Sequence, residues 1–250
     1  MIPATMTEMR SREGYGLASD DADGRRSAVE DVRGAVEFAE VVNSGSGGNV
    51  IAIEVQSAPR DPLSSVDAFR RSTEELARMG GDVRVWIEHC DTRIPGQDFE
   101  KGFLSLDDEL GVAAARGLGM LVNWGRSAIE LRSADRVTEH VHAAADAGVL
   151  RALIFSGVAS APTDYGPSWV DAHLPVKGSL DGDARGAVFD SSLLTKAHAV
   201  DALRAANVSD LECVGLKMGM PPGTPDDLRM AMLQANVELI ADLVDATARG

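Results

Sequence analysis

The sequence predicts an α/β protein, a TIM-type (β/α) barrel that lacks its first βα units in this chain. Five short apolar runs alternate with amphipathic helical patterns, and this alternation is typical of a parallel sheet covered by helices. No glycine-rich phosphate loop follows the first run, as an open dinucleotide-binding sheet would require. Because 250 residues suffice for one large core, we expect a single barrel domain over residues 1–250.

The expected strands are apolar, nearly continuous and rich in β-branched residues. They occupy residues 50–55, 83–88, 120–124, 150–157 and 211–218. Helical patterns fill residues 23–42, 65–80, 106–119, 133–149, 194–208 and 226–248. A complete barrel has eight strands, and only one partial candidate, MIPATM at 1–6, adds to these five. The deficit predicts either a barrel without roughly two N-terminal βα units or an open, doubly wound sheet, and we favour the barrel.

Composition narrows the class of partner. The formal net charge of −15 opposes binding to nucleic acid or an anionic membrane, but a few local cations can still hold an anionic substrate. No run approaches the roughly 20 apolar residues of a membrane helix, and the start MIPATMTEMR lacks a signal-peptide pattern. We therefore expect a cytoplasmic protein. Cys90 and Cys213 lie far apart in apolar segments, which predicts free thiols rather than a disulfide or a zinc site.

Polar residues gather where the apolar runs end, and we interpret these positions as the candidate active site. Ligands of parallel α/β folds bind at the carboxyl ends of the strands. The residues at these ends are Glu54, Gln56, Glu88, His89, Asp91, Asn123, Arg126, Glu130, Ser156 and Lys217. Burying several charges there without a role would be costly, because each loses its hydration.

Side-chain alternation distinguishes Glu88 from His89, since neighbours along a strand face opposite sides. Glu88 follows an isoleucine, as Glu54 does in its own strand, so we choose these two as the catalytic pair. His89 is then expected to face a helix and to bond a backbone carbonyl, with a catalytic role as the alternative. The two carboxylates serve either as acid and base or, with Asp91, as ligands of Mg²⁺ or Mn²⁺. No nucleotide cofactor is expected.

Two cations accompany the carboxylates. Lys217 ends the last strand. A lysine that loses hydration there gives up its proton more readily. Such a lysine is suited to Schiff-base chemistry, to proton transfer or to binding of a substrate oxygen. The alternative role of Lys217 is an ion pair with Glu54 or Glu88. The planar fork of Arg126 suits a carboxylate or a phosphate, and we favour pairing with a carboxylate of the protein itself.

The longest irregular segment, residues 157–192, exceeds an ordinary βα loop and is expected to act as a lid or as a binding element. It contains Tyr165, Trp169, Asp171 and His173, and aromatic faces suit sugar rings. The alternative is a packed surface insertion. The expected contacts to a small polar, sugar-like substrate are Gln56, Asn123, Arg126, Ser156, Tyr165, Trp169 and His173.

Four segments carry a resemblance to a known group of proteins: IEHCD, VNWGRSAIE, the FSG strand end with the later YGPSWVDAHLP, and VGLKM. With them in this order, the chain resembles an uncharacterised bacterial family related to the xylose-isomerase-like TIM barrels of sugar isomerases and sugar-phosphate epimerases. The resemblance runs from IPATM to the C-terminal helix. It implies a (β/α)₈ barrel that acts on a small sugar or polyol, often with a divalent metal. Members of that family begin earlier, with βα units before IPATM, in keeping with the strand deficit.

The metal-binding pattern departs from that of typical epimerases in the superfamily, which hold the metal with Glu, Asp, His and Glu from four strands. Glu54 matches the first Glu, and Glu88 or Asp91 matches the Asp. Asn123 stands near the expected His, and Lys217 ends the strand that normally supplies the last Glu. A cation there would repel Mn²⁺, so the resemblance supports the fold more than it supports metal-dependent isomerisation.

Three functions follow from these residues. The first is an isomerase, epimerase or related lyase that moves a proton next to a sugar carbonyl, with Glu54 and Glu88 as acid and base and with Lys217 and Arg126 stabilising the enediolate oxygen. The second is a Schiff-base aldolase or lyase that uses Lys217. The third is a noncatalytic sugar-binding or partner-binding barrel, whose exposed apolar edge a homodimer would cover.

Overall fold

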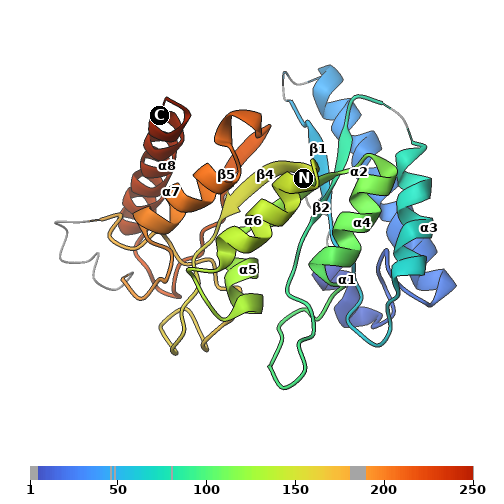
Figure 1. Cartoon of the computed structure of the whole chain (residues 1–250), viewed down its shortest axis with the longest axis horizontal. Helices are drawn as coiled ribbons and strands as arrows, with labels where there is room; N and C mark the ends of the chain where they lie inside the picture. Colours follow the sequence, from blue (N-terminus) through green and yellow to red (C-terminus); the bar gives the residue numbers. More distant parts are fainter. Residues whose placement is uncertain (1–4, 46, 48, 80, 181–189, 250) are drawn as a thin grey trace. The chain divides into compact units, whose positions relative to one another are not determined.

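The structure is a computed structural model that describes residues 5–45, 47, 49–79, 81–180 and 190–249 (Figure 1). Contacts divide the chain into two compact units, residues 1–121 with 147–149, and residues 122–146 with 150–250. Each unit is built from parallel strands and the helices that connect them. The expectation of a single barrel domain stays a prediction.

The first unit contains two complete strands and the start of a third. Its elements are α1 (Thr5–Ser11), α2 (Ala22–Gly45), β1 (Ala52–Val55), α3 (Val66–Ala77), β2 (Arg84–Glu88), α4 (Leu106–Arg116) and the first residues of β3 (Gly119–Asn123). β1 pairs with β2 in parallel, with Ala52 opposite Arg84 and Val55 opposite Ile87. β2 pairs with β3 in parallel, from Trp86 opposite Gly119 onward. α2, α3 and α4 pack side by side along these strands (Figure 1).

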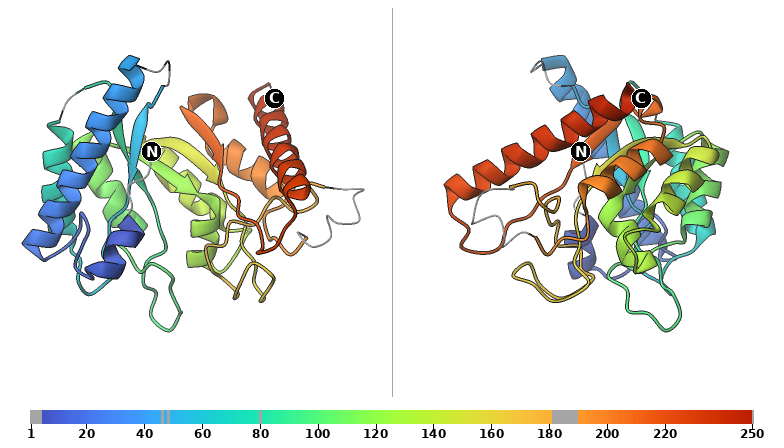
Figure 2. Two further views of the ribbon diagram at one scale, coloured as in Figure 1. Left: turned by 180° about the vertical axis from the view of Figure 1, so that it is seen from behind. Right: turned by 60° about the vertical axis from the view of Figure 1, so that its left-hand side comes forward.

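The second unit begins within β3 and holds the last two strands. Its elements are α5 (Trp124–Leu131), α6 (Val137–Asp146), β4 (Leu150–Phe155), α7 (Lys196–Ala205), a 3₁₀ turn (Val208–Asp210), β5 (Cys213–Leu216) and α8 (Asp226–Ala248). β4 and β5 are parallel, with Ala152 opposite Cys213 and Phe155 opposite Leu216. α8 lies beside β5 and α7 in both views of Figure 2.

All five expected strands are present, and every strand pair described above is parallel, so the predicted α/β class is confirmed. The apolar runs become strands because both faces of β1 and β3 are buried, as in parallel sheets covered by helices. The six helical patterns are confirmed as α2, α3, α4, α6, α7 and α8. Closure of the strands into a full barrel stays a prediction.

Two local expectations were wrong. Thr5 and Met6 belong to α1, not to a strand, because the run TMTEMR is rich in good helix formers; residues 1–4 of the expected MIPATM strand lie outside the described residues. Trp124 is not the last residue of β3 but the first of α5, a helix that the hydrophobic pattern did not separate from the strand. The Asn123 side chain accepts a hydrogen bond from the Gly125 amide and so starts α5 directly at the strand end.

An apolar groove of about 570 Å³ lies between β5 and α8. All four residues of β5 are partly exposed, and Leu233 and Val237 of α8 line the groove while remaining exposed to solvent. The expected homodimer stays a prediction. Among the described residues, no helix is both long enough and apolar enough to span a membrane.

Gly125 allows α5 to begin against the end of β4, and this contact generates a prediction. A Cβ atom at Gly125 would lie 2.4 Å from the backbone oxygen of Ser156. We expect Gly125→Ala to lower the free energy of unfolding by about 1–3 kcal/mol, measured by urea denaturation, because the backbone must shift. The control, Gly111→Ala in α4, meets no atom within 4 Å and should raise it by about 0.5–1 kcal/mol. Equal stability of Gly125→Ala and wild type would contradict the tight contact.

Candidate functional site

Buried charged and histidine side chains gather at the carboxyl ends of the strands in each unit. Among the described residues they are Glu54, Glu88, His89, Asp91, Lys101, Glu109, Arg126, Glu130 and His140. Most of them lie at the end of β1, β2 or β3 or in the segment that follows. Glu109 and His140 come from helices and contact His89 and Glu130, respectively. Ligands of parallel α/β proteins bind at this end of the strands. These are the positions at which the sequence predicts an active site, and that the residues form one stays a prediction.

At the ends of β1 and β2, Gln56 and Glu88 are direct partners. Gln56 Nε2 donates a hydrogen bond to Glu88 Oε2 at 2.8 Å, and Glu88 is only 1% exposed. The register pairs Glu54 with Trp86, so Glu54 lies two residues, about 6.6 Å, before the level of Glu88. The amide of Gln56 therefore orients the Glu88 carboxylate. The catalytic roles of Glu54 and Glu88 stay predictions.

His89 takes part in a fully buried network that sequence reasoning missed. Its Nδ1 lies 2.7 Å from Oε2 of Glu109 in α4, and Ser57 Oγ donates to Glu109 Oε1 at 2.5 Å. The backbone amide of Leu104 in turn donates to Ser57 Oγ at 3.2 Å. His89 thus faces a helix as expected, but this bond joins it to a carboxylate rather than to a backbone carbonyl. A signal was present, because Glu109 shares the buried face of α4 with Leu106 and other apolar residues.

Asp91 closes the loop that follows β2. Its Oδ2 accepts hydrogen bonds from the backbone amides of Glu100 at 2.7 Å and Lys101 at 2.9 Å, and its carbonyl accepts from the Gly102 amide at 2.9 Å. Oδ1 of Asp91 is buried and has no hydrogen-bond partner in the described part of the chain. Asp91 therefore holds the loop through Oδ2, whereas Oδ1 makes no hydrogen bond to the described residues. The metal-binding role of Asp91 stays a prediction.

In the second unit, the polar residues after β3 bind one another. Oδ1 of Asn123 accepts the Gly125 amide at 3.1 Å, so this side chain caps α5. His140 of α6 places Nδ1 3.1 Å from Ser127 Oγ and Nε2 3.6 Å from Glu130 Oε1. These contacts join α6 to α5 through buried polar atoms.

Arg126, Asp171, His173 and Ser156 form a connected group in the second unit. A guanidinium nitrogen of Arg126 lies 2.5 Å from Asp171 Oδ2, so Arg126 pairs with a carboxylate of the protein, in keeping with the chemistry of its side chain. Asp171 Oδ1 lies 3.2 Å from His173 Nδ1, and Ser156 Oγ lies 2.8 Å from the same nitrogen. The structure thus brings together residues from α5, from the end of β4 and from the long loop.

The described part of the long loop packs against α8 and also contains several of the predicted site residues. Tyr165 packs against Leu228 and Met232 of α8, and burial raises the pKa of its hydroxyl. Trp169 lies with its ring centroid 5.2 Å from the Arg132 guanidinium, a distance suited to a cation–π contact. His173 is instead partly exposed. The described part of the loop therefore contains an apolar anchor at Tyr165 and a solvent-facing histidine.

Lys217 and Ser156 are level at the ends of β5 and β4. Phe155 pairs with Leu216, and the backbone amide of Lys217 continues the ladder by donating to the Phe155 carbonyl at 2.9 Å. Residues at the same level of parallel strands share a face, so Lys217 and Ser156 lie on the same side. A lysine at this position can stabilise an oxyanion or form a Schiff base.

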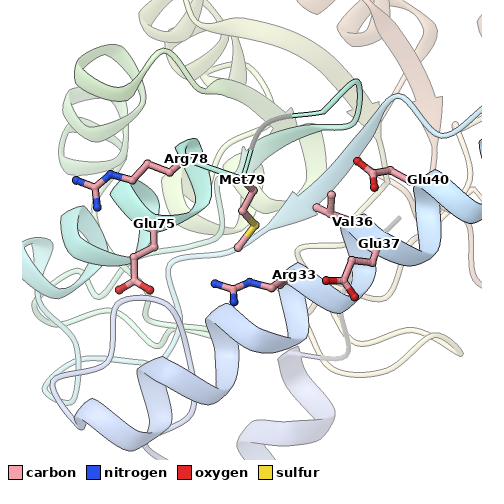
Figure 3. A pocket seen from close by; sticks show the side chains of 7 residues that line it. All are labelled: Arg33, Val36, Glu37, Glu40, Glu75, Arg78 and Met79. Atoms are coloured by element: carbon pink, nitrogen blue, oxygen red, sulfur yellow. The ribbon is translucent and has the colours of Figure 1, made fainter.

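A second hollow, about 520 Å³ in volume, lies between α2 and α3 (Figure 3). Its lining residues are Arg33, Val36, Glu37 and Glu40 from α2 with Glu75, Arg78 and Met79 at the end of α3. Two of its charges already have neighbours on their own helices, Arg33 with Glu30 and Arg78 with Glu74. β1 follows α2 and β2 follows α3, so the carboxyl ends of these helices lie near the amino ends of the strands. Ligands of such folds bind at the opposite, carboxyl ends, and this hollow is therefore not our candidate site.

The fold and the polar strand ends define an α/β protein with parallel strands and a candidate ligand site at their carboxyl ends. The chain belongs to a family described as "Domain of unknown function (DUF4862)", which it matches over residues 1–232. It is 33% identical over 225 residues to "Uncharacterized protein STM3670" of Salmonella typhimurium, an alignment that covers 87% of this chain and 69% of that protein.

A solved structure has a similar fold. It is a xylose isomerase domain containing protein from Salmonella typhimurium, with a TM-score of 0.53 and 8% identity, covering 85% of this chain and 70% of that one. At this identity the likeness concerns the fold alone. The family match confirms the resemblance to an uncharacterised family, and the similar solved structure shows that the fold resembles that of a xylose isomerase domain containing protein.

The buried network around Glu109 predicts a large loss of stability on truncation. Glu109→Ala removes the acceptor of both His89 and Ser57, so we expect the free energy of unfolding to fall by about 3–5 kcal/mol in urea denaturation. Asp107→Ala is the control, because Asp107 lies in the same first helical turn but is exposed; it should change stability by less than about 0.5 kcal/mol. Similar losses in the two variants would show that the network contributes little.

Proposed function

We propose that this protein is an enzyme of the isomerase or epimerase type that moves a proton next to the carbonyl group of a sugar or sugar phosphate. The observation that carries the proposal is the concentration of buried charged and histidine side chains at the carboxyl ends of the strands. Replacing such groups by apolar ones often leaves a protein equally stable or more stable, so stability alone does not account for them. Proton transfer beside a carbonyl needs positioned acids and bases of this kind.

Glu88 is the residue we assign to transfer of the carbon-bound proton. At 1% exposure, the Glu88 carboxylate lies away from bulk water, at the carboxyl end of β2 where ligands of parallel α/β proteins bind. The amide of Gln56 holds Oε2 at 2.8 Å and so fixes the direction in which the carboxylate acts. Glu54 stands before it in the same register and is the second carboxylate of the predicted pair.

Stabilisation of the enediolate oxygen is the role we assign to Lys217. It is partly exposed and shares a strand face with Ser156 at the carboxyl end of β5. A cation placed where negative charge develops lowers the barrier of reaction steps that form an oxyanion, because its position is set before the reaction begins. Arg126 is paired with Asp171. In this proposal Arg126 therefore holds Asp171 in place and does not itself stabilise the enediolate oxygen.

The residues predicted to hold Mg²⁺ or Mn²⁺ fit a hard cation in one respect. Oδ1 of Asp91 is a buried carboxylate oxygen without a hydrogen-bond partner in the described part of the chain, and hard cations prefer such oxygens. Glu54 and Glu88, the other predicted ligands, do not gather with Asp91: these three described carboxylates are not brought within 4.8 Å of one another, as a single ion would need. The proposal therefore derives no step from a bound ion, and the roles of Glu88 and Lys217 rest on the protein's own residues.

Hydrogen exchange tests this proposal even though the particular sugar is not identified. The protein is incubated in D₂O with a panel of free and phosphorylated aldoses and ketoses, and deuterium next to the carbonyl is measured by NMR. We expect incorporation with at least one sugar, and Glu88→Gln should lower its rate by about 10²- to 10⁴-fold.

Glu75→Gln, an exposed change in α3, is the matched control and should leave that rate unchanged. Full exchange by Glu88→Gln would remove Glu88 from the mechanism. Binding of a sugar by calorimetry, with no exchange for any member of the panel, would favour the noncatalytic sugar-binding function instead.

A Schiff-base aldolase is the second candidate, favoured by the position of Lys217 beside Ser156 at the strand ends. Borohydride reduces an imine to a stable amine and so reports this chemistry. For the isomerase proposal we expect mass spectrometry of borohydride-treated protein and substrate to find an unmodified Lys217 peptide. Added mass on that peptide, absent in Lys217→Met, would establish the aldolase instead.

A further inference from the structure

In the described part of the chain, the polar contacts of the His173 ring are all made by one of its two nitrogens, Nδ1. Nδ1 lies 2.8 Å from Ser156 Oγ and 3.2 Å from Asp171 Oδ1. The side chain is 32% exposed, and Nε2 has no hydrogen-bond partner among the residues that the structure describes. Any exchange of a proton between His173 and a ligand therefore takes place at Nε2.

The charge of Asp171 decides which nitrogen of the neutral imidazole carries the hydrogen. A carboxylate oxygen 3.2 Å from Nδ1 favours an N–H group there over a lone pair, although no hydrogen bond joins that oxygen to the ring. This preference would leave the lone pair of the neutral ring on Nε2. Arg126 binds the other oxygen of Asp171 at 2.5 Å and holds this carboxylate in place. The neutral ring is thereby prepared to accept a proton at Nε2.

The backbone around His173 is held in an unusual conformation. His173 has φ +57°, a left-handed value that L residues adopt at a cost and that is enriched at functional sites. Its carbonyl accepts a hydrogen bond from the Gly219 amide at 2.7 Å, and the next residue, Leu174, exchanges two bonds of 2.7 and 2.9 Å with Gly157. Backbone contacts from residues after β4 and β5 thus hold the main chain at His173 and Leu174 in place.

The arrangement differs from that of a nucleophilic serine. In a Ser-His-Asp relay the serine and the aspartate bind opposite nitrogens of the ring, so that the imidazole can take the serine proton. Here Ser156 Oγ and Asp171 Oδ1 both approach Nδ1. Ser156 is therefore a positioning residue, and the group that His173 can act on is a ligand at Nε2.

We propose that Nε2 of His173 carries the oxygen-bound proton of the substrate. The inference rests on the proposed function, because an aldose–ketose isomerisation moves one proton between carbons and another between oxygens, and the role of His173 concerns the second of these protons. Nε2 takes the hydroxyl proton as that O–H bond breaks and its electron pair forms the new carbonyl. The imidazolium then returns the proton to the oxygen of the former carbonyl, so that atoms and electrons balance.

The first test needs no substrate. In ¹⁵N NMR spectra of the wild-type protein, at a pH where His173 is neutral, we expect Nδ1 to carry the hydrogen and Nε2 to be bare. Asp171→Asn should shift the population toward the other tautomer, while His142→Gln, a change at an exposed position of α6, identifies an unrelated signal and leaves that of His173 unchanged. A hydrogen on Nε2 in the wild type would overturn the proposal.

The second test uses a sugar that the exchange panel identifies. Glycine adopts positive φ without strain, so His173→Gly should fold and yet lower kcat for isomerisation by about 10²- to 10⁴-fold, with KM changed by only a few fold. Added imidazole should restore part of the lost kcat, an effect that a purely structural role would not produce. His142→Gln should keep the wild-type kcat.

The two proposals fail in different ways. If no sugar exchanges its hydrogen in the presence of the wild-type protein, the proposed function fails, whereas the NMR experiment still decides the state of His173. If exchange occurs but His173→Gly isomerises at the wild-type rate, the proposed function stands and the role of His173 is wrong. Lost activity that imidazole does not restore would also count against a proton carrier at this position.

Discussion

In each unit, the register of the parallel strands decides which polar side chains meet. Pairing of Val55 with Ile87 in the first unit sets Gln56 beside Glu88. In the second unit, the pairing that ends β4 and β5 sets Ser156 level with Lys217. A slip of one residue would turn every side chain of a strand to the opposite face. The chemistry at the strand ends therefore depends on the hydrogen-bonded ladder beneath it.

Apolar burial on both faces of the strands maintains these registers. Ile53 of β1, Ile87 of β2 and Phe155 of β4 are fully buried, so a slipped strand would exchange apolar for polar groups in the core. The carboxyl ends lie next to this core, which explains why their polar residues are poorly hydrated. Hydrogen bonds such as those of Glu109 then compensate part of the cost of burying charge.

The two units stabilise a buried carboxylate through different partners. Glu109 is bonded to a histidine and a serine. Asp171 is paired with the guanidinium of Arg126 and also faces His173. Because an arginine keeps its charge at all ordinary pH values, Asp171 has a fixed counter-charge.

The sequence by itself determined the α/β class, the five strands and six of the helices, because local patterns of apolar residues report which faces are buried. It also predicted that the polar residues after the apolar runs come to lie at the carboxyl ends of parallel strands. It did not separate α5 from β3, because Trp124 continues the apolar run.

Only the tertiary structure decided the partners. Ser57 meets Glu109 across 52 positions, and Ser156 meets His173 across 17. Such contacts depend on strand register and on the path of long loops, neither of which a local pattern encodes. The pairing of Arg126 with a protein carboxylate follows from the chemistry of its side chain, but its particular partner, Asp171, came from the fold. The sequence shows which residue types are present, whereas the distances between their side chains are known only from the folded structure.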